Sequence, residues 1–236
     1  MRILFFLFLS LIILFPATDL SGIINSSVPV AGNPGKQDTI GKQILYNGRL
    51  WRNLYYRVRG DQFLFTDDLL PGTVTIDGRL FRNVMMSYDI LKDELLAIND
   101  RNMVIQLNKE KIDEFSFNYN DRIYRFRKLE GDSLNNLAGY VNVLADGNVS
   151  LLVKYKKEIV MTAVENTYDQ FNQLQRIYLM KDGITYLIKG KKDLIKQLSD
   201  QKLQVSYFIS TSKLKISRKD PDSFVPVMEF YNSLKK

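Results

Sequence analysis

Asn47-Gly48-Arg49-Leu50-Trp51-Arg52-Asn53-Leu54 returns later in the chain as Asp77-Gly78-Arg79-Leu80-Phe81-Arg82-Asn83-Val84, and a shorter copy follows as Asn120-Asp121-Arg122-Ile123-Tyr124-Arg125. Each copy opens with a dipeptide that suits a tight turn and continues into a run rich in β-branched and aromatic residues, which is typical of a β-hairpin. The copies are unequally spaced and the segments between them do not match, so a solenoid of true repeats is not indicated. The pattern predicts one hairpin solution used three times, with the aromatic residue in the core and the arginines facing outward.

Turn signals divide residues 42–189 into short runs that read as strands. Their regular spacing, with further turns at Asp146-Gly147 and Asp182-Gly183, predicts an antiparallel β-meander that forms a sandwich or an open barrel. Adjacent apolar residues such as Leu50 and Trp51 indicate a β-bulge after the first turns. Residues 160–174 fit either a short helix or a loop. We expect strands over 43–46, 49–55, 62–65, 72–76, 79–88, 94–98, 103–107, 114–119, 122–127, 140–144, 150–156, 176–180 and 185–188.

Helical periodicity replaces this pattern after Gly190. Residues 192–198 place their apolar side chains on one helix face, 201–214 predict a second helix, and Asp220-Pro221-Asp222-Ser223 supplies capping residues for a third. The expected fold class is therefore mainly β (α+β), with a β domain over 42–189 and a small helical tail over 190–236 packed on the sheet. This tail carries ten Lys or Arg and five Asp or Glu residues, so it holds +5 of the chain's net charge of +7.

The first 21 residues have the form of a secretory signal peptide. Arg2 precedes an apolar run from Ile3 to Phe15, which is shorter than the ~20 residues that span a bilayer. We expect cleavage between Ala17 and Gly22, with an uncleaved anchor as the alternative, and a flexible lead-in over 22–41. The protein is therefore expected to be exported to the periplasm or the outer-membrane periphery, with no transmembrane segment after the signal is removed.

The chain contains no cysteine and no histidine. Without cysteine it can form neither a disulfide nor an acylated lipoprotein anchor, and a domain of this size can bury its core without disulfides. Without histidine, Ser-His-Asp and Cys-His mechanisms and almost all zinc, copper and non-haem iron sites are excluded. We expect no metal and no cofactor, and the sequence favours a protein that is not an enzyme.

Arginine residues flank an aromatic residue in each copy of the repeat. Guanidinium groups stacked beside aromatic rings can bind carboxylates, phosphates or sugars, whereas on ordinary exposed strands they pair with acids across the sheet. The candidate ligand-binding residues are Arg49, Trp51, Arg52, Arg79, Phe81, Arg82, Arg122, Tyr124 and Arg125.

Acidic residues provide the alternative of carboxylate catalysis. Asp89, Asp93 and Glu94 form the densest group, followed by Asp67-Asp68, and neither has the spacing of a calcium loop. Two carboxylates such as Asp89 and Glu94 could serve a glycan hydrolase, but acids between strands more often support a turn. Residues 154–158, which are rich in lysine, predict a protected, exposed strand edge rather than a catalytic lysine.

The basic tail indicates an anionic partner. In a cell envelope such partners are lipid head groups, lipopolysaccharide phosphates or acidic glycans, and nucleic acid is not expected. The alternative is a solvated lysine-rich face with no ligand. The residues expected to contact an anionic surface are Lys191, Lys192, Lys213, Lys215, Arg218 and Lys219.

Several short phrases carry a resemblance that covers nearly the whole mature chain. With Asn47-Gly48-Arg49-Leu50-Trp51, residues 60–65 and 71–76, Tyr88-Asp89-Ile90 and residues 229–234, the chain resembles exported proteins of unknown function from Bacteroidetes-type bacteria. The resemblance implies an envelope location but no activity or site residues.

The function expected from the sequence is that of a non-enzymatic envelope protein. It would act as a binding or scaffolding module for envelope proteins, anionic lipid or glycan. Two alternatives stay open at this point, namely a carrier of an apolar ligand within a curled sheet and a carboxylate-dependent glycan hydrolase.

Overall fold

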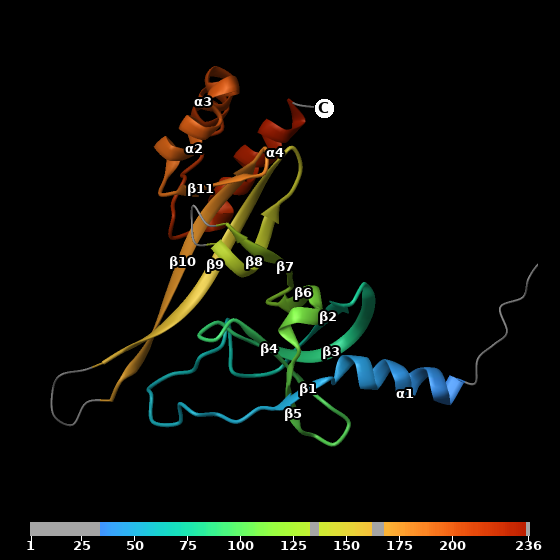
Figure 1. Cartoon of the computed structure of the whole chain (residues 1–236). Helices are drawn as coiled ribbons and strands as arrows, with labels where there is room; N and C mark the ends of the chain where they lie inside the picture. Colours follow the sequence, from blue (N-terminus) through green and yellow to red (C-terminus); the bar gives the residue numbers. More distant parts are fainter. Residues whose placement is uncertain (1–33, 133–136, 162–167, 235–236) are drawn as a thin grey trace, which may run out of the picture.

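The computed structural model describes residues 34–132, 137–161 and 168–234, which form one antiparallel sheet of eleven strands with helices at its two ends (Figure 1). The expected fold class, mainly β with a few helices, is confirmed. The strands are β1 (Gly48–Leu50), β2 (Leu70–Ile76), β3 (Arg79–Asp89), β4 (Glu94–Ile98), β5 (Val104–Leu107), β6 (Ile112–Tyr119), β7 (Arg122–Asp132), β8 (Leu137–Ala145), β9 (Val149–Val160), β10 (Gln170–Lys181) and β11 (Ile184–Ile188). The α-helices are α1 (Pro34–Leu45), α2 (Lys191–Gln197), α3 (Lys202–Thr211) and α4 (Val225–Ser233). Short 3₁₀ turns are η1 (Lys109–Lys111), η2 (Ser199–Gln201) and η3 (Pro221–Phe224).

The strand order is β1-β5-β4-β3-β2-β6-β7-β8-β9-β10-β11. From β6 to β11 the chain is a simple meander, as predicted. The first half is not a simple meander. β2 to β5 follow one another across the sheet, but the chain then returns past β4, β3 and β2, so that β6 pairs with the free side of β2. β1 pairs with β5 instead of β2. All the strands belong to one continuous sheet with β1 and β11 at its edges, so the arrangement is a single open sheet rather than two packed sheets.

The second and third copies of the repeat form the hairpins that were predicted. Asp77 and Gly78 between β2 and β3 have φ of 48° and 73°, and Asn120 and Asp121 between β6 and β7 have φ of 49° and 57°. Positive φ at both central residues is the geometry of a type I′ turn, which matches the twist of a hairpin. In the second copy, the pairing of β2 with β3 skips Asn83, whose φ is 54°, so the expected bulge lies there.

The first copy does not form a hairpin, so the prediction of three hairpins is wrong. Gly48 begins the edge strand β1 directly after α1, and a Cβ added there would lie 2.0 Å from the carbonyl oxygen of Gln106. The glycine is therefore required by the close approach of β1 to β5, not by a turn. The chain leaves the sheet after Leu50, which ends the strand expected over 49–55.

Two more expected strands are absent. Residues 43–46 lie at the end of α1, where Ile44, Leu45 and Tyr46 pack against the sheet, and 34–41 of the expected lead-in are helical too. Residues 62–65 make only one isolated bridge, between Phe63 and Asp89. Of the ambiguous segment 160–174, residue 160 ends β9 and residues 170–174 begin β10, so these parts are strand rather than the expected helix or loop, and 162–167 lie outside the described residues. The predicted signal peptide and residues 22–33 also lie outside them, and these predictions stay untested.

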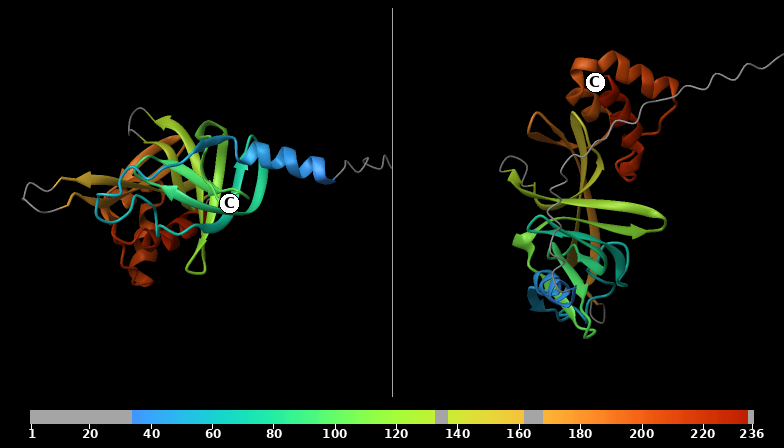
Figure 2. Two further views of the ribbon diagram at one scale, coloured as in Figure 1. Left: turned by 90° about the horizontal axis from the view of Figure 1, so that it is seen from below. Right: turned by 90° about the vertical axis from the view of Figure 1, so that its right-hand side faces the viewer.

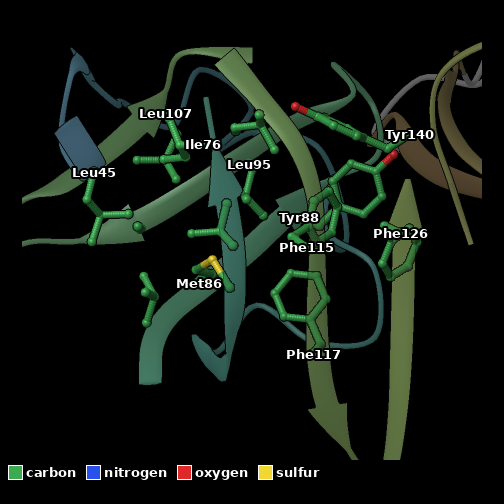
Figure 3. Packing of buried hydrophobic residues seen from close by; sticks show 14 of the residues in the cluster. Leu45, Ile76, Met86, Tyr88, Leu95, Leu107, Phe115, Phe117, Phe126 and Tyr140 are labelled. Carbon is green, nitrogen blue, oxygen red and sulfur yellow. The ribbon is translucent and has the colours of Figure 1, made fainter. Parts of the chain in front are cut away.

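Two large hydrophobic clusters stabilise the fold, and a smaller third cluster joins Leu137, Val141, Leu152 and Tyr178. In the first, the curled half of the sheet encloses aromatic rings whose centroids are 4.8–6.0 Å apart (Figure 3). These rings belong to Tyr88, Phe115, Phe117, Phe126 and Tyr140. In the second, α2, α3 and α4 pack against β9, β10 and β11 at one end of the sheet (Figures 1 and 2). Because rings fill the curl, the carrier alternative gains no support from this core.

A partly buried ionic cluster fastens the curl from four separate segments. The carboxylate of Asp93, in the β3–β4 turn, accepts hydrogen bonds from Lys109 Nζ at 2.6 Å, Lys154 Nζ at 2.8 Å and the hydroxyl of Tyr88. Burial acts to raise the pKa of Asp93, but the lysine charges and these hydrogen bonds outweigh it and hold the pKa below its usual value. The backbone N–H of Lys157 also donates to the carbonyl of Ile90 at 3.1 Å, which joins β9 to the end of β3.

The lysine-rich run 154–158 lies in β9 beyond its pairing with β8, which ends at Val153, so this stretch pairs with β10 on one side only. The predicted strand edge is not fully exposed, however, because Lys157 is buried and its backbone N–H donates to Ile90. Lys154 pairs with Asp93, and the buried Lys157 donates to Asp61 Oδ1 at 2.9 Å and to the carbonyl of Phe63 at 2.6 Å. These lysines are therefore internal ties of the fold.

Candidate functional site

A row of side chains crosses four strands on the sheet face opposite the aromatic core. The register places Ser87 of β3 opposite Leu96 of β4, Leu96 opposite Gln106 of β5, and Gln106 opposite Arg49 of β1. Directly opposed residues of antiparallel strands point to the same face, so these four form a continuous floor. Arg49 Nε donates to Gln106 Oε1 at 2.7 Å, which fixes the outer end of the row.

The segment that follows β1 forms the wall above this floor. The backbone N–H of Trp51 donates to Val104 at 2.9 Å, and that of Leu64 donates to Tyr88 at 2.9 Å, so both ends of the wall are tied to the sheet. Trp51 also packs on Phe63, with ring centroids 5.8 Å apart. This cover leaves Ser87 only 4% exposed, although it lies on the outer face.

Two adjoining hollows between wall and floor share Trp51, Tyr55 and Gln62, and we refer to them together as the Trp51 groove. Their volumes are about 360 and 480 Å³. The first hollow is lined by Arg49, Leu50, Trp51, Arg52, Leu54, Tyr55, Gln62, Asp89, Lys92, Glu94 and Gln106. The second is lined by Trp51, Asn53, Tyr55, Gly60, Asp61, Gln62, Phe63, Asp67, Asp68, Leu69, Ser87, Leu96 and Val104. The repeat copy quoted first above thus supplies the centre of this site.

The charges in the Trp51 groove are separated. Arg52 and Lys92 line the first hollow, and within the described ranges neither forms an ion pair. Lys92 lies over the ring of Tyr55, 5.8 Å from its centroid, and a hydrogen bond with Tyr55 raises the pKa of this lysine. Asp67 and Asp68 line the second hollow. In the first hollow Glu94 pairs with Arg49 and Asp89 is buried, so among the described residues the charges left without an ion pair there are basic, whereas Asp67 and Asp68 make the second hollow acidic.

Ser87 is a buried polar group that lacks a partner. Its Oγ makes no hydrogen bond with any residue that the structure describes, and it lines the second hollow. Buried hydroxyl groups nearly always have a partner. A ligand hydroxyl or an ordered water at the base of the hollow would supply one. Sequence reasoning missed this residue because nothing in the run from Val84 to Asp89 marks which side chains the wall covers.

The acidic pair suggested for catalysis does face this groove, but its chemistry is structural. Asp89 and Glu94 are opposed in the β3–β4 hairpin. Asp89 is 1% exposed, and its Oδ1 accepts from the backbone N–H groups of Leu91 and Lys92, both at 2.9 Å. Burial raises the pKa of Asp89 above its usual value, although these hydrogen bonds act to lower it. Glu94 forms an ion pair with Arg49 at 3.5 Å. Asp89 thus caps the turn and offers little surface to a substrate, while Asp93 belongs to the ionic cluster of the core.

The other arginine–aromatic pairs lie elsewhere, so the candidate residues do not form one strip. Arg79 lies over the ring of Phe81, 5.5 Å from its centroid, and Arg82 lines the same hollow of about 660 Å³ between α1 and β3. Arg122 lies over Tyr124, 4.6 Å from its centroid, and forms a bidentate pair with Asp222 of η3. Arg125 is exposed on β7. Of the three copies, only the first faces the Trp51 groove.

The six basic residues predicted to contact an anionic surface lie at the helical end of the molecule. Lys191 and Lys192 begin α2, Lys213 and Lys215 follow α3, and Arg218 and Lys219 precede η3. All six are exposed. The carbonyl groups of Arg218 and Lys219 accept from Gln175 Nε2 at 3.1 and 3.0 Å, which ties this loop to β10.

None of the helices within residues 34–132, 137–161 and 168–234 has the length and apolar composition needed to cross a membrane. In that same part of the chain, acidic side chains nowhere gather in a group of three or more that could hold a metal ion.

No protein-family model, curated protein or solved structure matches this chain, so these comparisons assign it to no family. The resemblance to exported bacterial proteins therefore stays a prediction.

Proposed function

We propose that this chain is an exported, non-enzymatic binding module that holds a glycan bearing an acidic sugar in the Trp51 groove. The observation that carries the proposal is the position of Trp51 and Tyr55 beside two cations, Arg52 and Lys92, that have no carboxylate partner in the described ranges. Aromatic rings give sugar rings an apolar platform, and guanidinium or ammonium groups make the strongest hydrogen bonds with carboxylates.

The remainder of the groove suits sugar hydroxyl groups. Asn53 offers an amide, Asp67 and Asp68 offer hydrogen-bond acceptors, and the partnerless hydroxyl of Ser87 lies at the base. An acidic group would therefore lie on the Arg52 side and neutral hydroxyl groups on the Asp67 side, because a second negative charge would be repelled there. This asymmetry favours a mostly neutral glycan with an acidic branch over a polyanion.

The positions of Asp89 and Glu94 give the hydrolase alternative less support than the binding function. A retaining or inverting hydrolase needs two carboxylates that reach the scissile bond, one of them as an acid. Asp89 is almost completely buried and is bound by its own turn, and Glu94 pairs with Arg49. Binding without cleavage is what this arrangement supports.

The single tryptophan makes a direct assay possible, because Trp51 is the only one in the chain and lies in the groove. The probes are xylo-oligosaccharides with and without a glucuronic acid branch, titrated against Trp51 fluorescence and by calorimetry. A hydrogen bond to a charged group contributes about 1.5–3 kcal/mol, so the acidic probe should bind at least roughly tenfold more tightly than the neutral one.

Two matched substitutions test the role of the arginine. Arg52→Gln should reduce the preference for the acidic probe, because only Lys92 of the two cations then remains, whereas Arg125→Gln, at the equivalent Arg of the third copy but on β7, should leave it unchanged. Equal effects of the two changes, or no binding of either probe at millimolar concentration, would refute the proposal. Release of shorter products during the titration would show that the hydrolase alternative is correct instead.

A further inference from the structure

The outer face of α3 exposes two large apolar side chains. Leu203 and Tyr207 are 83% and 72% exposed, while Val205 and Ile209 of the same helix are buried in the second core cluster. Residues four positions apart lie one above the other on a helix, so Leu203 and Tyr207 form one small apolar ridge. The ridge is not needed to hold α3 on the sheet, because the opposite face of the helix does that.

The helical end that carries this ridge has more basic than acidic residues, ten against five over residues 190–236. In the described part of the helical end, Lys191, Lys192, Lys202, Lys213 and Lys215 form no ion pair. Lys202 begins α3, Lys213 and Lys215 follow it, and all five lysines are exposed, so the helical end, as far as the structure describes it, presents unpaired positive charge to solvent.

Two of the acids at this end are neutralised from outside it. Asp200 accepts from Lys181 Nζ at 2.8 Å and from the hydroxyl of Tyr231, and Asp222 pairs with Arg122. Lys181 belongs to β10 and Arg122 to β7, so these two acids are neutralised by cations from the sheet and not by lysines of the helical end. The surface thus keeps more of its positive charge than its composition alone implies.

We propose that the outer face of α3 docks on an anionic lipid bilayer. Leu203 enters the boundary between head groups and acyl chains, Tyr207 lies at the interface with its hydroxyl in water, and the surrounding lysines contact anionic head groups. Charge complementarity selects this partner, because several exposed lysines at the same end as a small apolar ridge suit a fluid array of phosphates better than one fixed binding site. The proposal does not depend on the proposed glycan binding.

The arrangement of the two sites fits this orientation. α3 lies at the end of the molecule farthest from α1 and β1, with the length of β9 and β10 between them (Figures 1 and 2). A bilayer in contact with α3 would therefore leave the Trp51 groove, which includes residues of β1, at the end of the molecule distant from the membrane.

A fluorescent reporter tests the contact in the full chain. Because the chain has no cysteine, Leu203→Cys provides a unique attachment site for an environment-sensitive dye, and Ile123→Cys provides a matched control site, 67% exposed on β7. Vesicles of phosphatidylglycerol and phosphatidylethanolamine should shift the emission at position 203 to the blue, but not at position 123. Pure phosphatidylcholine vesicles should shift neither. The reporter at 203 responds to α3 itself, whatever the apolar N-terminal run does.

Charge variants carrying the same reporter supply the second test. Each lysine near an anionic surface contributes roughly a fivefold gain in binding, so Lys202→Gln with Lys213→Gln should weaken the vesicle response by about tenfold or more. Arg101→Gln with Arg125→Gln removes the same charge from exposed sites outside the helical end and should change it by less than about twofold. No blue shift at position 203, an equal shift at position 123, or equal losses in the two double variants would each overturn the proposal.

Discussion

Replacing Asp93 with Asn should destabilise the fold far more than the same change at Asp77. The carboxylate of Asp93 accepts hydrogen bonds from Lys109, Lys154 and Tyr88, and this side chain is 21% exposed. Asp77 pairs with Lys111 at 3.0 Å, but the side chains are 56% and 43% exposed. Both aspartates have positive φ, 58° and 48°, which Asn tolerates as well as Asp, so the substitution tests charge and not backbone strain.

The magnitudes follow from the two environments. Removing one partner of a buried ion pair costs about 3–5 kcal/mol, and the solvent that still reaches Asp93 lowers the expected loss to about 2–4 kcal/mol. The exposed pair at Asp77 should contribute less than about 1 kcal/mol. Urea unfolding followed by circular dichroism measures both differences. Adding Lys154→Met to Asp93→Asn should recover part of the loss, because it removes a lysine left without its carboxylate.

The pH dependence of the stability gives an independent check that the charged form of Asp93 stabilises the fold. The pKa of Asp93 is held below its usual value in the folded chain, so its contribution is fully present above the unfolded pKa of about 3.9 and is lost as the pH falls through the folded pKa. The stability difference between the wild type and Asp93→Asn should therefore be constant near neutral pH and shrink below about pH 4. If Asp93→Asn loses no more stability than Asp77→Asn, or if the difference does not change in acid, the cluster does not fasten the curl.

Two further substitutions test other contacts. Gly139→Ala should destabilise the fold by more than about 2 kcal/mol, since φ is +77° and the added Cβ would lie 1.8 Å from Asp93 Oδ2. Gly183→Ala should cost only about 1 kcal/mol, because φ is a similar +76° but the space around it is open. Similar losses of the two variants in urea unfolding would contradict the clash at Gly139. Arg122→Gln should cost less than about 1 kcal/mol because Arg122 and Asp222 are 38% and 43% exposed, and a larger loss in the thermal midpoint would show that this pair anchors the helical end.

Local patterns predicted most of the strands and turns. The strand over 94–98 and the hairpin turns at Asp77-Gly78 and Asp182-Gly183 were found because alternation and turn chemistry are encoded within a few residues. The failures came where tertiary contacts override local preference. Residues 43–46 end a helix because they cover the sheet, and the first Asn-Gly meets a neighbouring strand instead of closing a hairpin.

The candidate site shows the same limit more clearly. The repeat directed attention to Arg49, Trp51 and Arg52, and the structure does place them in one groove. It also disperses the two other copies, and it adds Lys92 and Ser87, which no spacing in the sequence indicated. Neighbours in this site come from strands and a loop distant in sequence, so only the strand pairing could identify them.

By itself, the sequence determined the mainly β class, most of the turns and the absence of histidine and cysteine chemistry, because composition and short-range periodicity carry that information. The tertiary structure alone decided that β6 joins β2 and that Arg49, Gln106, Leu96 and Ser87 form one row beneath Trp51. Strand order and register depend on long-range pairing, and a shift of one residue would turn that row toward the core. The role of the first Asn-Gly-Arg-x-Trp segment is therefore a property of the sheet it joins.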